Sequence, residues 1–144
     1  MNEKNNLFKK ALDLAENISF KVSPRPPVAA IVTYNGKIIG QGVTTINPLK
    51  HAEINAIDDA KKKLKSLNDC TLYSTLEPCF HTGHTEPCVD KIIESGIKKI
   101  IIGSIDPNPK VNKKSINKLK NNKTTVELIV DNDLKKRSDN LIEP

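Results

Sequence analysis

Residues 75–88, which read TLEPCFHTGHTEPC, hold two of the three cysteines and two of the three histidines in this 144-residue chain. Cys79 and Cys88 each follow a proline, so their thiols lie at the ends of a stiff loop. Thiolate and imidazole are zinc ligands, and a site built from cysteine alone needs four thiolates. The loop therefore cannot complete a zinc site by itself, and a further ligand must come from elsewhere.

The remaining histidine, His51, is the obvious donor, and Glu53 lies two residues after it. His-x-Glu followed by Pro-Cys and a second cysteine is the pattern of a zinc deaminase site. Catalytic zinc typically has three protein ligands and one open position, where it lowers the pKa of a water to about 7. We therefore expect His51, Cys79 and Cys88 to bind Zn²⁺, and Glu53 to move a proton from the water to a substrate nitrogen.

The hydrophobic pattern predicts the elements that must position these residues. Helical spacing or capping predicts helices over residues 6–18, 51–65, 88–95, 113–122 and 131–141. Apolar and β-branched runs predict strands over residues 28–34, 37–44, 70–75, 99–105 and 125–130, and residues 46–50 are expected to form a loop. Asn35-Gly36 favours a type I′ turn between the first two strands, because both central residues of that turn need a positive φ.

This order of elements predicts an α/β fold: a three-layer α/β/α sandwich with a mixed five-stranded sheet, forming one domain over residues 1–144. His51 and Cys88 each begin a predicted helix, and Cys79 follows a predicted strand. The three side chains can therefore converge at one edge of the sheet. Glu53 lies in the first turn of its helix, where the positive end of the helix dipole should make it easier for a carboxylate to stay ionised, which suits a base.

The composition narrows the class of protein further. The chain is 37% hydrophobic but only 3% aromatic, so its core must be aliphatic, and its net charge of +6 fits either a solvated lysine-rich surface or an anionic partner. There is no apolar run of the length that a signal peptide or a membrane span needs, which predicts a cytoplasmic protein. Cysteines there are usually reduced, which favours a metal site over a disulfide. Cys70, at the start of a predicted strand, is expected to be a small buried apolar residue.

Three segments carry a resemblance to a known family: HAEINAI at 51–57, TLEPCFHTGHTEPC at 75–88 and DPNP at 106–109. Together they resemble the deaminase domain of the bacterial riboflavin-biosynthesis deaminase/reductase, within the cytidine-deaminase-like superfamily. The resemblance runs from about residue 7 to residue 128. Eight residues separate Cys79 from Cys88, as in that branch, whereas nucleoside and tRNA-editing members typically have Cys-x-x-Cys.

The resemblance implies a set of site residues and a reaction. It places the zinc ligands at His51, Cys79 and Cys88, the proton-shuttling glutamate at Glu53, and substrate contacts at His81, His84, Asp106, Asn108 and Arg25. The implied reaction is hydrolytic removal of the 2-amino group of 2,5-diamino-6-(5-phosphoribosylamino)pyrimidin-4-one, with release of ammonia. It also implies a separate reductase later in the pathway, and self-association, for which the aliphatic face of residues 7–18 is available.

Several substrate-facing positions differ from the family's pattern. Arg25 replaces an asparagine, Val43-Thr44 replaces an aromatic-histidine pair, His84 replaces a basic residue, Glu86 replaces a proline, and NKKS at 112–115 replaces Gly-x-Gly. The alternative is therefore a related zinc deaminase that acts on a different aminopyrimidine or nucleotide-like substrate. A nucleic-acid-editing enzyme is disfavoured, because the chain has only five aromatic residues to stack on bases and its cysteine spacing differs. A purely structural zinc module is disfavoured as well, because such a site has no use for a base such as Glu53.

Overall fold

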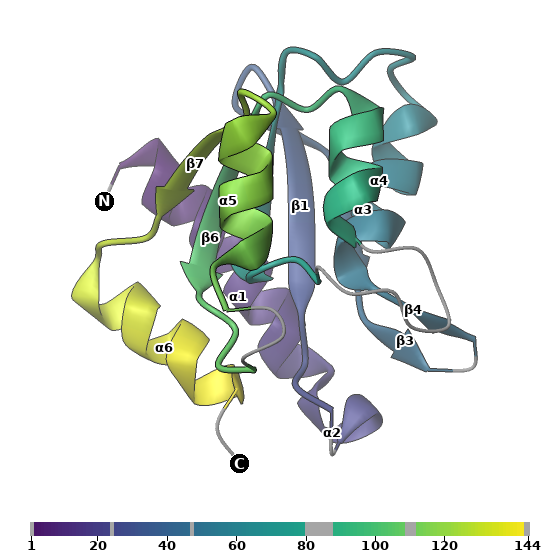
Figure 1. Ribbon diagram of the computed structural model, residues 1–144. Coiled ribbons are helices and arrows are strands. Elements are labelled where there is room, and N and C mark those ends of the chain that lie inside the picture. The colour runs from purple at the N-terminus through teal and green to yellow at the C-terminus, as the bar shows by residue number, and fades with distance from the viewer. Residues whose placement is uncertain (1, 24, 47, 80–87, 109–111, 143–144) are drawn as a thin grey trace.

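The computed structural model describes residues 2–23, 25–46, 48–79, 88–108 and 112–142. Its main sheet contains β1 (Ala29–Tyr34), β2 (Lys37–Val43), β5 (Cys70–Leu76), β6 (Lys99–Ser104) and β7 (Thr125–Leu128), in the order β2-β1-β5-β6-β7. β1 is antiparallel to β2 and β5, whereas β5, β6 and β7 are parallel (Figure 1). The predicted mixed five-stranded sheet is confirmed, and its strand ends fall within two residues of the predicted ones.

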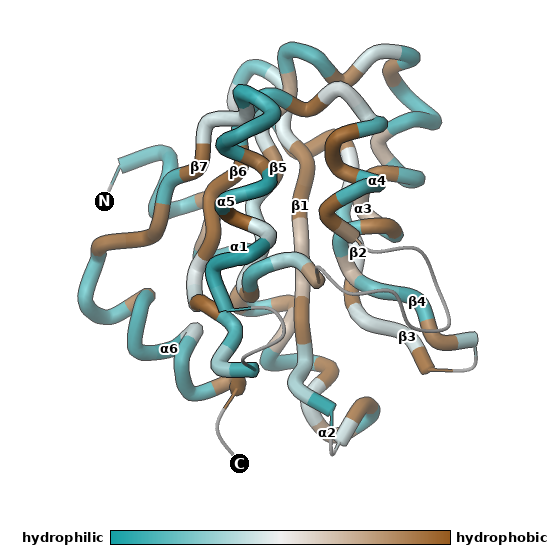
Figure 2. Tube along the Cα trace, in the orientation of Figure 1, coloured by the Kyte–Doolittle hydropathy of each residue, from teal (hydrophilic) through white to brown (hydrophobic). Residues whose placement is uncertain are grey.

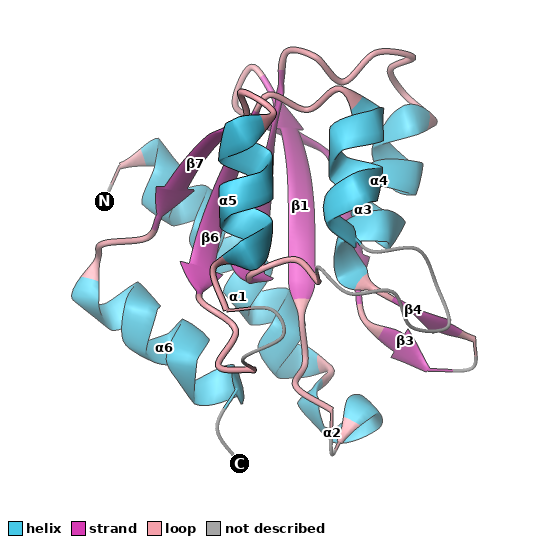
Figure 3. Ribbon diagram, in the orientation of Figure 1, coloured by secondary structure: helices cyan, strands magenta, loops and turns pink. Residues whose placement is uncertain are grey.

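Helices cover both faces of this sheet, which confirms the three-layer prediction (Figure 3). One face packs against α3 (Ala52–Lys61), α4 (Cys88–Ser95) and α5 (Lys114–Asn121). The other packs against α1 (Glu3–Asn17) and α6 (Asn132–Ile142), and the short α2 (Ser19–Val22) follows α1. Successive strand residues point to opposite faces, so each central strand contributes side chains to both apolar layers.

The two layers are aliphatic, as the composition predicts, and among the described residues Phe8 and Tyr73 add aromatic rings to them. In Figure 2 the inner strand β1 is largely coloured as hydrophobic, whereas α5 and α6 carry long hydrophilic stretches. The apolar side of α1, including Leu7 and Leu12, is buried against the sheet. The expectation that this face serves self-association is therefore wrong, because the chain's own core covers it.

The predicted turn chemistry is present at two positions. Asn35 and Gly36, with φ of 50° and 76°, join β1 to β2 as the type I′ turn requires. Gly96, with φ of 86°, follows the last turn of α4, where a left-handed residue ends a helix.

Three local predictions need correction. Within the expected loop, β3 (Thr45–Ile46) and β4 (Leu49–Lys50) pair as a small antiparallel sheet, and the Thr45 hydroxyl donates a hydrogen bond to the Pro48 carbonyl oxygen. Two-residue strands are too short to show a hydrophobic period. Helix α3 ends at Lys61 instead of residue 65, and Leu64, beyond its end, still packs against the core. Helix α1 begins at Glu3, three residues early, because the Asn2 side chain accepts a hydrogen bond from the Asn5 N–H.

Helix α3 lies directly on the backbone of β2. A Cβ atom on Gly40 would lie 2.5 Å from the Ala56 carbonyl oxygen, and one on Gly42 would lie 2.5 Å from the Ala56 nitrogen. Ala52, Ala56 and Ala60 recur every four residues on the facing side of the helix and are fully buried. This glycine–alanine interface, formed by Gly40 and Gly42 with those alanines, sets the height of α3, and so of its first turn, above the sheet.

Across the described segments, no helix combines the length and the apolar character that crossing a membrane would require.

The glycine–alanine interface leads to a stability prediction. Gly42→Ala would force α3 away from β2, and overpacking of this kind costs about 1–3 kcal/mol. We expect the free energy of unfolding, measured by urea titration, to fall by that amount. Gln41→Ala is the matched control, because Gln41 lies between the two glycines with an exposed side chain. Equal stability of the two variants would show that α3 does not depend on this close contact.

Candidate active site

His51 is placed by the start of helix α3. Its backbone is extended, with φ of −76° and ψ of 152°, and its carbonyl oxygen accepts the first helical hydrogen bond, from the Asn55 N–H at 3.1 Å. The Asn55 side chain donates to the Val43 carbonyl oxygen at 2.9 Å, which ties this turn to the end of β2. The imidazole therefore projects from a helix start that is anchored on two sides.

Cys79 and Cys88 are placed by the end of β5 and the start of α4. The Cys88 N–H donates to Cys79 Sγ at 2.9 Å, and the Val89 N–H donates to the Cys79 carbonyl oxygen at 3.2 Å. Free N–H groups and the positive dipole end of a helix favour thiolate over thiol. The first turn of α4 thus both fixes Cys79 and stabilises its negative charge.

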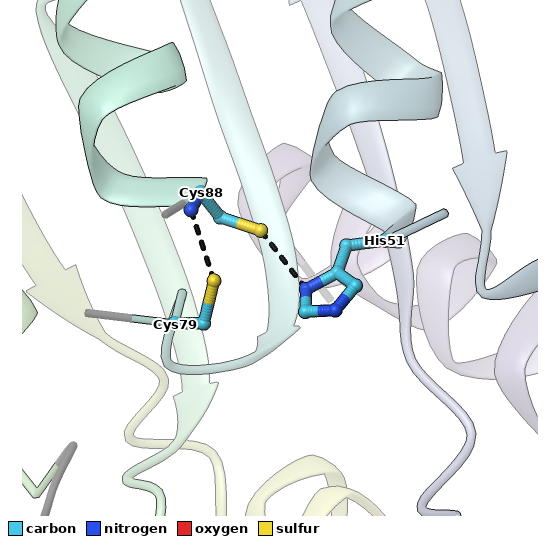
Figure 4. A group of neighbouring side chains, drawn as sticks. All are labelled: His51, Cys79 and Cys88. Carbon is cyan, nitrogen blue, oxygen red and sulfur yellow. Dashed lines mark hydrogen bonds between the residues drawn. The ribbon is translucent and has the colours of Figure 1, made fainter. Parts of the chain in front are cut away.

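The two cysteines and His51 lie around one point, as Figure 4 shows. His51 Nδ1 lies 3.0 Å from Cys88 Sγ, and the ligand atoms of all three residues lie within 4.8 Å of one another. One nitrogen and two sulfur ligands form a set that suits zinc and leaves a fourth position open. The structure confirms the predicted convergence of His51, Cys79 and Cys88 at one edge of the sheet.

The protonation of the two thiols is strongly linked. The hydrogen bond from the Cys88 thiol lowers the pKa of Cys79 to about 4, and the same bond raises the pKa of Cys88 above that of an ordinary thiol. The pKa of His51 is raised, above all by the neighbouring Cys79 sulfur. Two adjacent thiolates repel each other, so the pair retains a proton. A divalent cation can displace that proton and offset the repulsion between the two thiolates.

Glu53 is in the first turn of α3, and only 4% of its surface is exposed. Burial raises its pKa to about 7, and the negative charge of Cys79 adds to the shift. The ease of ionisation that the sequence predicts from the helix dipole is therefore outweighed by burial. The dipole contributes a fraction of a unit charge, and removal of a carboxylate from water costs more than that attraction returns.

The predicted substrate contacts are only partly within the described residues. His81 and His84 lie outside them. Arg25 is exposed, and its positive charge acts weakly to lower the pKa of His51. Asp106 follows β6, and its Oδ1 accepts a hydrogen bond from the Asn108 N–H at 2.9 Å, which is the geometry of a turn-forming aspartate.

Glu77 is a residue that sequence reasoning missed. It lies between β5 and Cys79, is 2% exposed, and accepts hydrogen bonds from the segment after β6 and from Ser115. The sequence did offer a signal for it: Glu77 is a charged residue between Leu76 and Pro78, directly after a buried strand. Cys70, in contrast, is the buried residue that the sequence predicts, and burial raises the pKa of its thiol.

Comparison with known proteins defines the class. Residues 1–104 match the sequence model of the cytidine and deoxycytidylate deaminase zinc-binding region. Because this match covers well over half of the chain, the protein belongs to that family of zinc-binding deaminases.

Within the family, its relatives are deaminases of riboflavin biosynthesis. The diaminohydroxyphosphoribosylamino-pyrimidine deaminase of Buchnera aphidicola subsp. Schizaphis graminum is 47% identical over 107 residues, which cover 74% of this chain and 71% of the relative. The riboflavin biosynthesis protein RibD of Aquifex aeolicus is 44% identical over 116 residues, covering 81% of this chain but only 32% of the relative.

A solved structure shows the same fold. The diaminohydroxyphosphoribosylaminopyrimidine deaminase/5-amino-6-(5-phosphoribosylamino)uracil reductase of Thermotoga maritima aligns with a TM-score of 0.89 at 40% identity. The alignment covers 98% of this chain and 39% of that one. The chain thus spans about a third of the Aquifex protein and about two fifths of the Thermotoga protein, and the activities of those longer proteins reach it only as proposals.

The ligand geometry predicts which cysteines matter for metal. Loss of an outer-shell partner already costs about 10–100-fold in metal affinity, so we expect Cys79→Ser and Cys88→Ser to lose stoichiometric zinc. Cys70→Ala is the matched control and should keep one zinc per chain, measured with a colorimetric chelator after unfolding. Zinc retained in both site variants, or lost in the control, would contradict this ligand set.

Proposed function

We propose that this chain is a zinc-dependent hydrolase that removes the 2-amino group of 2,5-diamino-6-(5-phosphoribosylamino)pyrimidin-4-one in riboflavin biosynthesis. The observation that carries the proposal is the group formed by His51, Cys79 and Cys88, with ligand atoms within 4.8 Å of one another. Glu53 is buried in the turn that follows His51. The names of the relatives supply the substrate.

The chemistry is consistent with the second activity named for the Thermotoga protein. Hydrolysis replaces the 2-amino group of a pyrimidin-4-one by oxygen and releases ammonia. The product of that exchange is a 5-amino-uracil derivative, and the reductase half of that relative is named for 5-amino-6-(5-phosphoribosylamino)uracil. The proposal therefore includes a separate reductase that consumes the product.

In this proposal His51, Cys79 and Cys88 hold the zinc ion. When bound, zinc lowers the pKa of a water so that it loses a proton near neutral pH. Glu53 accepts that proton on its carboxylate while the water oxygen bonds to C2 of the ring. Glu53 then donates the proton to the amino nitrogen, and the hydroxyl proton on C2 moves to the adjacent ring nitrogen. The C–N bond breaks, ammonia leaves and the C2 carbonyl forms.

Substrate contacts at Arg25, Asp106 and Asn108, together with His81 and His84, belong to the same proposal. The exposed positive charge of Arg25, which acts on His51, supports a role in attracting a phosphorylated, anionic substrate. We place the enzyme, as one domain over residues 1–144, in the cytoplasm, because ligand cysteines must stay reduced and the three cysteines are free. Self-association, if it occurs, uses a face other than the buried side of α1.

A second candidate has the same chemistry on another aminopyrimidine or a nucleotide-like substrate. The presence of Arg25, where the family's pattern has asparagine, favours it, since a guanidinium and an amide present different hydrogen-bonding groups to a ring.

The two candidates differ in the compound that releases ammonia. We expect the purified zinc-loaded protein to deaminate the diaminopyrimidine ribonucleotide with a kcat/KM at least about 100-fold above that for dCMP, cytidine or guanine, since unpaired buried polar groups reject poorly matched rings. The measurement is ammonia release, coupled to NADPH oxidation. Turnover of one of the other compounds, with none of the riboflavin intermediate, would establish the second candidate.

Glu53 can be tested separately from the substrate pocket. Positioned proton transfer contributes about 10²–10⁴-fold to rate, so Glu53→Gln should lower kcat by at least about 100-fold while keeping zinc and fold. Asp58→Asn, an exposed carboxylate on the same helix that pairs with Lys50, should leave kcat within about twofold. A Glu53→Gln variant with full turnover would remove Glu53 from the mechanism.

A further inference from the structure

Glu77 gathers hydrogen bonds from three separate positions. Its Oε1 accepts from the Asp106 N–H at 3.2 Å and from the Lys113 N–H at 3.0 Å, and its Oε2 accepts from the Ser115 hydroxyl at 2.7 Å. Its own N–H donates to the Ser104 carbonyl oxygen at 2.8 Å. A buried carboxylate with its oxygens occupied in this way is a fixed point in the fold.

The two ends of one segment meet at this fixed point. Asp106 and Lys113 are seven positions apart, and both donate backbone N–H groups to the same oxygen. Between them lies Asn108, whose N–H is in turn bound by the Asp106 side chain. Glu77 is two residues from Cys79, so one carboxylate connects a candidate metal ligand to both candidate substrate contacts after β6.

The backbone at one of these ends is strained. Lys113 has φ of 60°, in the left-handed region that a non-glycine residue adopts only at a cost. Such a conformation persists where the surroundings hold it, and the N–H that Glu77 accepts is that of Lys113 itself. The charge-assisted hydrogen bond therefore acts at the strained residue.

We propose that Glu77 is a positioning residue, which holds Asp106 and Asn108 at the distance from Cys79 that substrate binding needs. Asp106 and Asn108 are contacts in the proposed function, so the kinetic part of this inference rests on it. The positional part does not. Loss of the carboxylate should weaken substrate binding and leave bond breaking, which depends on Glu53 and the metal ligands, nearly unchanged.

Glu77→Gln tests the positional part without any substrate. The amide keeps one acceptor oxygen but carries no charge, so the Asp106 and Lys113 N–H groups lose a charge-assisted partner, while the NH₂ group can still donate to the Ser115 hydroxyl oxygen. Replacing a charged acceptor by a neutral one corresponds to about a 10-fold change in an opening equilibrium. We expect amide hydrogen exchange at Asp106 and Lys113, followed by NMR, to become at least about 10-fold faster. Exchange at Ile101, inside β6, and the zinc content should not change.

Ser95→Ala is the matched control for general destabilisation. Ser95 is buried at the far end of α4, and its hydroxyl both donates to the Ile92 carbonyl oxygen and accepts from the Ile97 N–H. It should lower the melting temperature without selective exchange at Asp106 and Lys113. Uniformly faster exchange in Glu77→Gln, or the same selective pattern in Ser95→Ala, would overturn the positioning role.

Kinetics with the compound that the wild-type protein turns over give the second readout. We expect Glu77→Gln to raise KM by about 10-fold with kcat within about threefold, and Ser115→Ala, which keeps the carboxylate, to show a smaller shift of the same kind. Lys113→Gly should restore part of the Glu77→Gln loss, because glycine adopts a positive φ without strain. A fall in kcat at unchanged KM would refute the inference. A wild-type protein that turns over no aminopyrimidine would refute only the proposed function.

Discussion

The site depends on one electrostatic constraint: an imidazole and two sulfurs, all electron-rich, must be held close enough to share a cation. Left to themselves, two thiolates at this separation repel each other, and the pair keeps a proton, as the opposite pKa shifts of Cys79 and Cys88 show. The fold offsets this repulsion with backbone N–H groups at the start of α4, which bind the sulfur and the carbonyl oxygen of Cys79. A bound zinc ion would neutralise the remaining repulsion between the two thiolates.

The scaffold around the ligands is built from contacts that leave little freedom. Gly40 and Gly42 let α3 lie on the backbone of β2, so the helix start that bears His51 and Glu53 has a defined height above the sheet. Glu77 fixes the segment after β6 relative to Cys79 by hydrogen bonds to its backbone. The glycine–alanine interface is apolar and close-packed, whereas Glu77 is a buried charge. Together they fix the segments on both sides of the same sheet edge.

This division matches the chemistry of the family. The candidate metal ligands and the proposed proton carrier come from helix starts and a strand end, where the backbone is held by regular hydrogen bonds. The candidate substrate contacts come from connecting segments, as is usual for groups that determine specificity. Such a scaffold keeps a deamination centre unchanged while the ring that it accepts varies, which is consistent with Arg25 and Lys113 at positions where the family's pattern has other residues.

The sequence by itself determined the features that depend on local chemistry. Residue periodicity predicted the sheet and its covering helices, Asn35-Gly36 predicted its turn, and the spacing of His51, Cys79 and Cys88 predicted their convergence, because strand ends and helix starts meet at a sheet edge. Only the tertiary structure decided the features that depend on distant neighbours. It buried Glu53, so that loss of water outweighs the helix dipole and raises the pKa of this carboxylate. It also covered the apolar side of α1 with the sheet and brought the backbone of residues 106 and 113 to Glu77. Desolvation and partner choice are set by residues far away along the chain, and no local pattern encodes which of them will arrive.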